Sequence, residues 1–120
     1  MRTAVALAVA VSLFLGCYGG GSPAPDASSC TTELPACPAS PPSYKTTVSP
    51  ILNQACVTCH YTGTTIAKND FSTYDKVHQD LGAALNQVYA CAMPPATSTP
   101  LTADQRQTLL EWLVCGAPNN

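Results

Sequence analysis

The residues best suited to chemistry in this chain are the run Cys56-Val57-Thr58-Cys59-His60. Two cysteines three positions apart, followed directly by a histidine, occur in redox dithiols, in zinc sites and at attachment points for covalent haem. A zinc site requires four ligands, but the only other histidine is His78 and no second CxxC exists. A thioredoxin-like dithiol follows a strand, whereas a helical pattern precedes this motif. Zinc and dithiol chemistry are therefore the weaker interpretations.

Haem attachment requires two thiols for thioether bonds, a histidine beside them to bind iron, and a second axial ligand downstream. Met93 lies 33 residues after His60 and is the only methionine apart from Met1. Pro94 and Pro95 follow it and restrict the backbone, which lowers the entropic cost of holding the thioether in place. His78 is the other candidate for this position, although an exposed helical histidine is its simpler interpretation.

The order of these parts resembles that of the single-haem, class I-like c-type cytochromes. In that family a CxxCH motif opens the domain, a Met-Pro loop follows, and an amphipathic helix closes it. The resemblance covers roughly Tyr44 to Asn120. It implies an all-α domain of three or more helices around one haem c. It also implies thioether links at Cys56 and Cys59 and iron ligands at His60 and Met93.

Two features of the chain depart from this family. No proline lies between His60 and Met93 to supply the carbonyl that commonly accepts a hydrogen bond from the histidine's second nitrogen. The first helix has Thr47 and Val48 where the family often packs a glycine against an aromatic residue, so Trp112 is expected to pack differently.

The function implied by the resemblance is one-electron transfer to an unidentified redox partner protein, by an electron carrier rather than an enzyme. One alternative is a haem enzyme or gas-sensing domain in which Met93 is displaced. Another is a haem-free, disulfide-stapled surface lipoprotein.

The amino-terminal segment predicts export. Residues 1–16 combine one positive charge with an apolar run that is shorter than the roughly 20 residues of a membrane-spanning helix, as in a secretory signal peptide. The sequence Leu13-Phe14-Leu15-Gly16-Cys17 resembles the lipobox of bacterial lipoproteins, which implies a lipid on Cys17. We therefore expect a cell-envelope protein, lipid-anchored in the periplasm or at the outer membrane.

The remaining cysteines predict disulfides, which persist outside the cytosol. They are Cys30, Cys37, Cys91 and Cys115, and four cysteines allow three pairings. Because Cys30 and Cys37 share a short proline-containing loop, we expect them to pair with each other and to leave Cys91 paired with Cys115.

Composition divides the chain into a spacer and a domain. Residues 17–43 are rich in proline, glycine and serine and are expected to form an extended tether, whereas residues 44–120 form the folded domain. Helices are predicted over about 46–55, 73–89 and 102–115, the last with a capping-box start at Thr102 and a stop at Gly116. The formal net charge is −2 and no basic patch occurs, so nucleic acid is not an expected partner.

Overall fold

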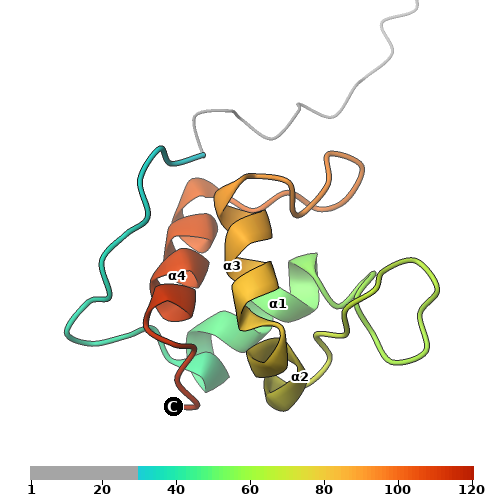
Figure 1. Cartoon of the computed structure of the whole chain (residues 1–120), viewed down its shortest axis with the longest axis horizontal. Coiled ribbons are helices and arrows are strands. Elements are labelled where there is room, and N and C mark those ends of the chain that lie inside the picture. Colours follow the sequence, from blue (N-terminus) through green and yellow to red (C-terminus); the bar gives the residue numbers. More distant parts are fainter. Residues whose placement is uncertain (1–29) are drawn as a thin grey trace, which may run out of the picture.

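The computed structural model describes residues 30–120, and the predicted signal peptide, the predicted lipid-bearing Cys17 and the first part of the spacer lie outside them. Five helical elements follow one another: the π-helical turn η2 (Tyr44–Val48), α1 (Ser49–Ala55), α2 (Tyr74–Gln79), α3 (Leu81–Tyr89) and α4 (Ala103–Val114). Residues 30–120 contain no β-strand (Figure 1). The prediction of a small helical domain is therefore confirmed.

Local sequence signals account for the start of α1 and for both ends of α4. Pro50 lies in the first turn of α1, where its missing N–H costs nothing. Thr102 caps α4 in the predicted capping box, since its side chain accepts from the Gln105 N–H and the Gln105 side chain accepts from the Thr102 N–H. Gly116, at φ +80°, ends that helix because glycine adopts the left-handed conformation without strain.

The predicted second helix is divided into two. Asp80, with φ −102° and ψ 18°, ends α2 and precedes α3. Aspartate competes with helical hydrogen bonding through its own side chain, and Gly82 is also a weak helix former. The buried face nevertheless continues across the break, since Val77 of α2 and Val88 of α3 are both buried.

The core forms around α4. Leu109, Leu110 and Leu113 are buried on its inner face, and α3 packs beside it. Trp112 is fully buried, stacks on Tyr44 with ring centroids 5.6 Å apart, and donates its indole N–H to the Pro118 carbonyl. The closing helix thus meets the start of the domain through a pair of aromatic rings.

The expected disulfide pairing is wrong. The structure pairs Cys30 with Cys91 and Cys37 with Cys115, with Cα atoms 6.0 and 4.9 Å apart. Both separations lie in the range that a disulfide requires. The pairing differs because residues 30–43 run back along the domain, so that Cys30 reaches the end of α3 and Cys37 reaches the end of α4 (Figure 1).

The second half of the predicted spacer is therefore fastened to the domain. Besides the two bridges, the Tyr89 hydroxyl donates to the Thr32 carbonyl, and the Ser43 hydroxyl donates to the Asn120 carbonyl. Residues 30–43 form no helix, and we call them the strap. Within the described part of the chain, no helix has both the length and the apolar character needed to cross a bilayer.

Candidate functional site

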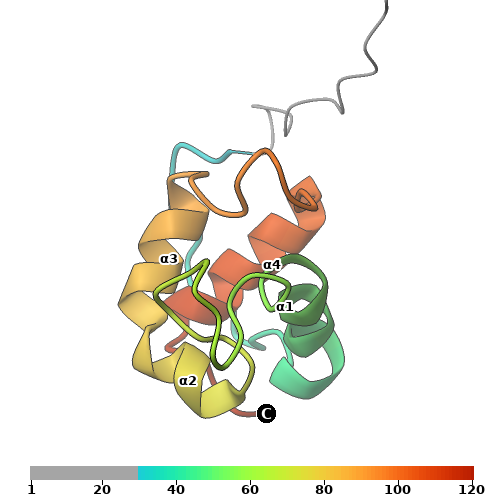
Figure 2. The same cartoon turned by 90° about the vertical axis from the view of Figure 1, so that its right-hand side faces the viewer.

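An apolar pocket of about 440 Å³ lies between α1, α3, α4 and the loop that follows the CxxCH motif. Figure 2 shows this loop crossing in front of the space between α1 and α3. The pocket brings together all four predicted cofactor residues: Cys56, Cys59, His60 and Met93. Aliphatic and aromatic side chains make most of the remaining wall, among them Leu52, Phe71, Val77, Val88, Leu109 and Leu113. His78 is exposed beside Tyr74 and does not line the pocket, as its simpler interpretation predicts.

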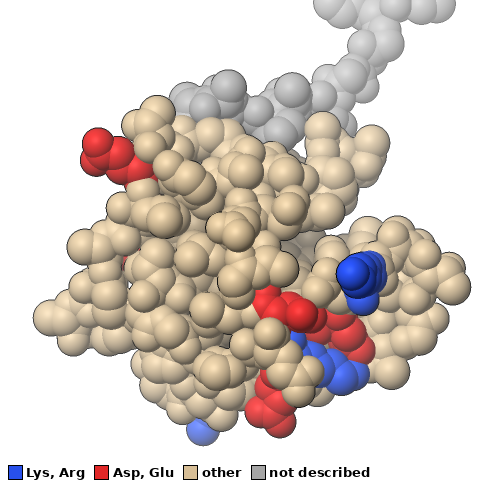
Figure 3. Space-filling model, in the orientation of Figure 1, with Lys and Arg blue, Asp and Glu red and all other residues tan. Residues whose placement is uncertain are grey.

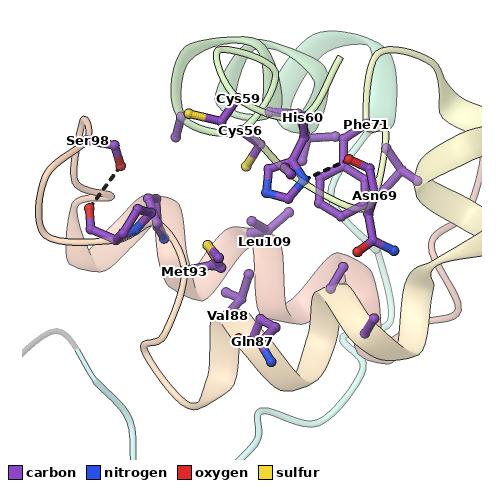
Figure 4. A pocket seen from close by; sticks show the side chains of 18 of the residues that line it. Cys56, Cys59, His60, Asn69, Phe71, Gln87, Val88, Met93, Ser98 and Leu109 are labelled. Carbon is purple, nitrogen blue, oxygen red and sulfur yellow. Dashed lines mark hydrogen bonds between the residues drawn. The ribbon is translucent and has the colours of Figure 1, made fainter. Parts of the chain in front are cut away.

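The CxxCH motif forms one wall because it continues directly from α1. The Cys56 N–H donates to the Leu52 carbonyl at 2.8 Å, and the His60 N–H donates to the Cys56 carbonyl at 2.9 Å. These bonds coil the motif into a tight turn with the side chains of Cys56, Cys59 and His60 at the pocket (Figure 4). Neither Cys56 nor Cys59 forms a disulfide. Burial raises the pKa of the Cys56 thiol to about 11, so this side chain is held in its neutral form.

The His60 ring is oriented by its neighbours. Its Nδ1–H donates to the Asn69 carbonyl at 2.8 Å, and Phe71 stacks on the ring with centroids 4.6 Å apart. The Phe71 N–H closes the same loop by donating to the His60 carbonyl. With Nδ1 engaged in this way, Nε2 keeps its lone pair for another partner. The acceptor for this nitrogen, which the sequence does not identify, is therefore the Asn69 carbonyl.

Met93 reaches the pocket from the opposite wall. Figure 4 shows its side chain extending from the segment after α3 toward the side that holds His60. The N–H groups of Ala92 and Met93 both donate to the Gln87 carbonyl, at 3.0 and 3.1 Å. Two residues earlier, Cys91 has a positive φ of 55° and carries the bridge to Cys30.

A polar clasp holds the two ends of the loop after the motif. Asp70 accepts hydrogen bonds from Lys76 at 2.5 Å, from the Thr62 hydroxyl at 2.7 Å and from the Ser72 N–H at 2.8 Å. Lys76, followed by Ser72 and Thr62, holds the pKa of this carboxyl well below its usual range. Charged side chains are otherwise sparse on the face shown in Figure 3, where most of them gather on one side.

Two contributors to the site were not predicted from the sequence. The Asn69 acceptor is a backbone carbonyl, which no residue pattern identifies. Arg106, whose guanidinium binds the Met93 carbonyl, did leave a signal. It precedes Leu109, Leu110 and Leu113 by three, four and seven positions, which places it on the buried face of the helix.

The predicted electron-transfer function is contradicted. Within residues 30–120, no group of three or more His, Cys, Asp or Glu side chains could hold a metal ion. This finding counts against an electron carrier with iron bound between His60 and Met93. The two long-range disulfides fit the alternative of a disulfide-stapled protein better. We therefore do not propose electron transfer for this domain.

No protein-family model matches this chain, and neither a curated protein nor a solved structure does so.

Proposed function

We propose that this chain is an exported, disulfide-stapled domain that binds one large apolar ligand in the pocket between Cys56 and Met93. The observation that carries the proposal is the pocket itself. Its volume of about 440 Å³ and its mainly apolar wall are typical of sites for small molecules and cofactors. The few sulfur and nitrogen atoms that reach it converge from two facing walls (Figure 4).

Haem, attached through Cys56 and Cys59, is the ligand that we propose for this pocket. Both thiols are unbridged and line the cavity, and they are the groups that thioether attachment needs. The engaged Nδ1 of His60 leaves Nε2 available, and Met93 lies on the facing wall. The proposal concerns covalent attachment through these two thiols and assigns no electron transfer to the domain. When bound, haem would supply an iron centre whose reactivity depends on its axial ligands.

The chain's own residues would prepare the site for this ligand. Asn69 and Phe71 hold the His60 ring in one orientation, so little side-chain entropy remains to be lost on binding. Val77, Val88 and Leu109 are buried and line the cavity, so this part of its wall offers only apolar side chains. The arrangement resembles a small cytochrome c-like domain, and we propose that architecture on these grounds.

The disulfides support the exported location because such bridges persist in oxidising compartments. They also support the haem-free alternative, since small domains with a thin core often rely on cross-links for stability. We further propose that a lipid on Cys17 holds the domain at a membrane.

The test is a pyridine haemochrome assay on the full chain matured in a periplasm that attaches c-type haem. We expect covalent haem in the wild type and in His78→Ala, whose side chain lies outside the pocket, and none in Cys56→Ser/Cys59→Ser. If the wild type carries no haem, haem is not the ligand of this pocket and the haem-free, disulfide-stapled alternative is favoured. Binding of the neutral fluorescent probe phenylnaphthylamine then tests the pocket. If the chain takes up neither haem nor the probe, the proposed function is wrong.

A further inference from the structure

Arg106 is the only charged side chain that is buried in residues 30–120, with 2% of its surface exposed. Burying a charge without a compensating partner costs several kcal/mol or more. No carboxylate pairs with it, since the single ion pair among these residues joins Lys76 to Asp70. The guanidinium must therefore be compensated by something other than an acidic side chain.

Two backbone carbonyls provide that compensation. The Arg106 Nη1 donates to the Val88 carbonyl at 2.6 Å and to the Met93 carbonyl at 3.3 Å. Val88 lies in the last turn of α3, where the helix dipole is negative. Its carbonyl also accepts from the Cys91 N–H at 3.2 Å, and its second lone pair accepts from the guanidinium. A cation from α4 thus joins the end of α3 to the segment that carries Met93.

Both bonded residues line the pocket, which distinguishes this contact from ordinary core packing. The N–H groups of Ala92 and Met93 are already bound to the Gln87 carbonyl. Arg106 binds the Met93 carbonyl on the other side of the same residue. The backbone of Met93 is consequently held at both its N–H and its C=O.

The contact carries a cost that a purely structural residue would avoid. The Nε–H of Arg106 is buried and has no hydrogen-bond partner among the described residues. A buried donor without a partner destabilises the folded state, because it gives up its hydrogen bonds to water. A methionine or leucine at this position would fill the space without that penalty.

We propose that Arg106 is a positioning residue that holds the Met93 side chain against the pocket. The inference rests on the proposed function, because it assigns Met93 to the wall of a ligand site. It predicts that loss of the guanidinium releases the Met93 thioether while the helical core remains folded.

The test uses the full-length, ligand-free chain labelled with ¹³C on its methionine methyl groups, of which Met93 supplies the only one besides Met1. Two variants remove the guanidinium, Arg106→Leu and Arg106→Met. The methionine introduced by Arg106→Met adds a methyl signal, which is identified by its absence from the spectrum of Arg106→Leu. In both variants the Met93 methyl signal should narrow and move to the position of free methionine, while the emission of buried Trp112 stays unchanged. Arg106→Lys, which keeps a donor, should largely restore the wild-type signal. Gln107→Lys, on the exposed face of α4, is the matched control.

An unchanged Met93 signal in folded Arg106→Leu would overturn the inference, even if its unfolding midpoint falls. If Arg106→Leu does not fold, the Met93 methyl signal of Arg106→Lys is measured at high pH, where the lysine loses its charge and its hydrogen bonds to the two carbonyls weaken. A signal that stays identical to wild type under that condition would also refute the inference. A second measurement separates this inference from the proposed function. Affinity for phenylnaphthylamine should fall by about five- to tenfold in Arg106→Leu, the size of one lost net hydrogen bond. A wild type that binds no ligand would refute the proposed function while leaving the methyl-signal result standing.

Discussion

The disulfide pairing of the strap cysteines can be tested by comparing the stability of two variants that each lack two cysteines. Cys30→Ser/Cys91→Ser removes one bridge, whereas Cys30→Ser/Cys37→Ser removes both. Under the pairing predicted from the sequence, these outcomes would be reversed. The two variants therefore distinguish the pairings by stability alone.

The magnitude follows from loop closure. The bridges join residues 61 and 78 positions apart. In the chain-entropy model either one alone stabilises the domain by about 4 kcal/mol. The two loops overlap, so once one bridge has formed the other closes a ring of only about 31 residues and adds slightly less, about 3.5 kcal/mol. We expect Cys30→Ser/Cys91→Ser to lose about 3.5 kcal/mol and Cys30→Ser/Cys37→Ser to lose about 8 kcal/mol, which approaches the whole stability of a small domain.

The assay is denaturant unfolding followed by Trp112 fluorescence, because this fully buried residue is the only tryptophan. Remaining thiols are blocked by alkylation so that no new bridge forms. Peptide mapping without reduction gives an independent reading of the pairing. If Cys30→Ser/Cys37→Ser proves more stable than Cys30→Ser/Cys91→Ser, the strap does not fold back as described and the reasoning fails.

Two further predictions concern the clasp and the membrane. The pKa of Asp70 is lowered in the folded state, so its contribution to stability is present above its unfolded pKa of about 4 and is lost as pH falls below that value. The difference in urea midpoint between wild type and Asp70→Asn should therefore shrink from pH 7 to pH 3, and an equal difference at both pH values would contradict the clasp. Cys17→Ser should move the chain from the membrane fraction to the soluble fraction with Trp112 emission unchanged. Retention on membranes after a high-salt wash would argue against the lipid anchor.

Features that depend on neighbouring residues were predictable from the sequence. The capping box at Thr102 and the stop at Gly116 act over a few residues, and both lie where they were expected. Pro50 in the first turn of α1 is a local signal of the same kind. The CxxCH motif and the Met-Pro-Pro run likewise pointed to Cys56, Cys59, His60 and Met93, which line one pocket. Local chemistry thus determined the residue types of the site, the start of α1 and both ends of α4.

Features that depend on the path of the chain were decided only by the tertiary structure. A pairing of four cysteines depends on which segments meet in space, and the short loop between Cys30 and Cys37 favoured the wrong choice because nothing in the sequence indicates that the strap folds back. The acceptor for His60 is a carbonyl nine residues away, and carbonyls are common to all residue types. Trp112 meets Tyr44 across 68 positions, a contact made when α4 closes the core. Sequence by itself therefore determined which groups this domain offers to a ligand, whereas long-range packing determined how those groups are held, because only packing brings distant backbone and side chains together.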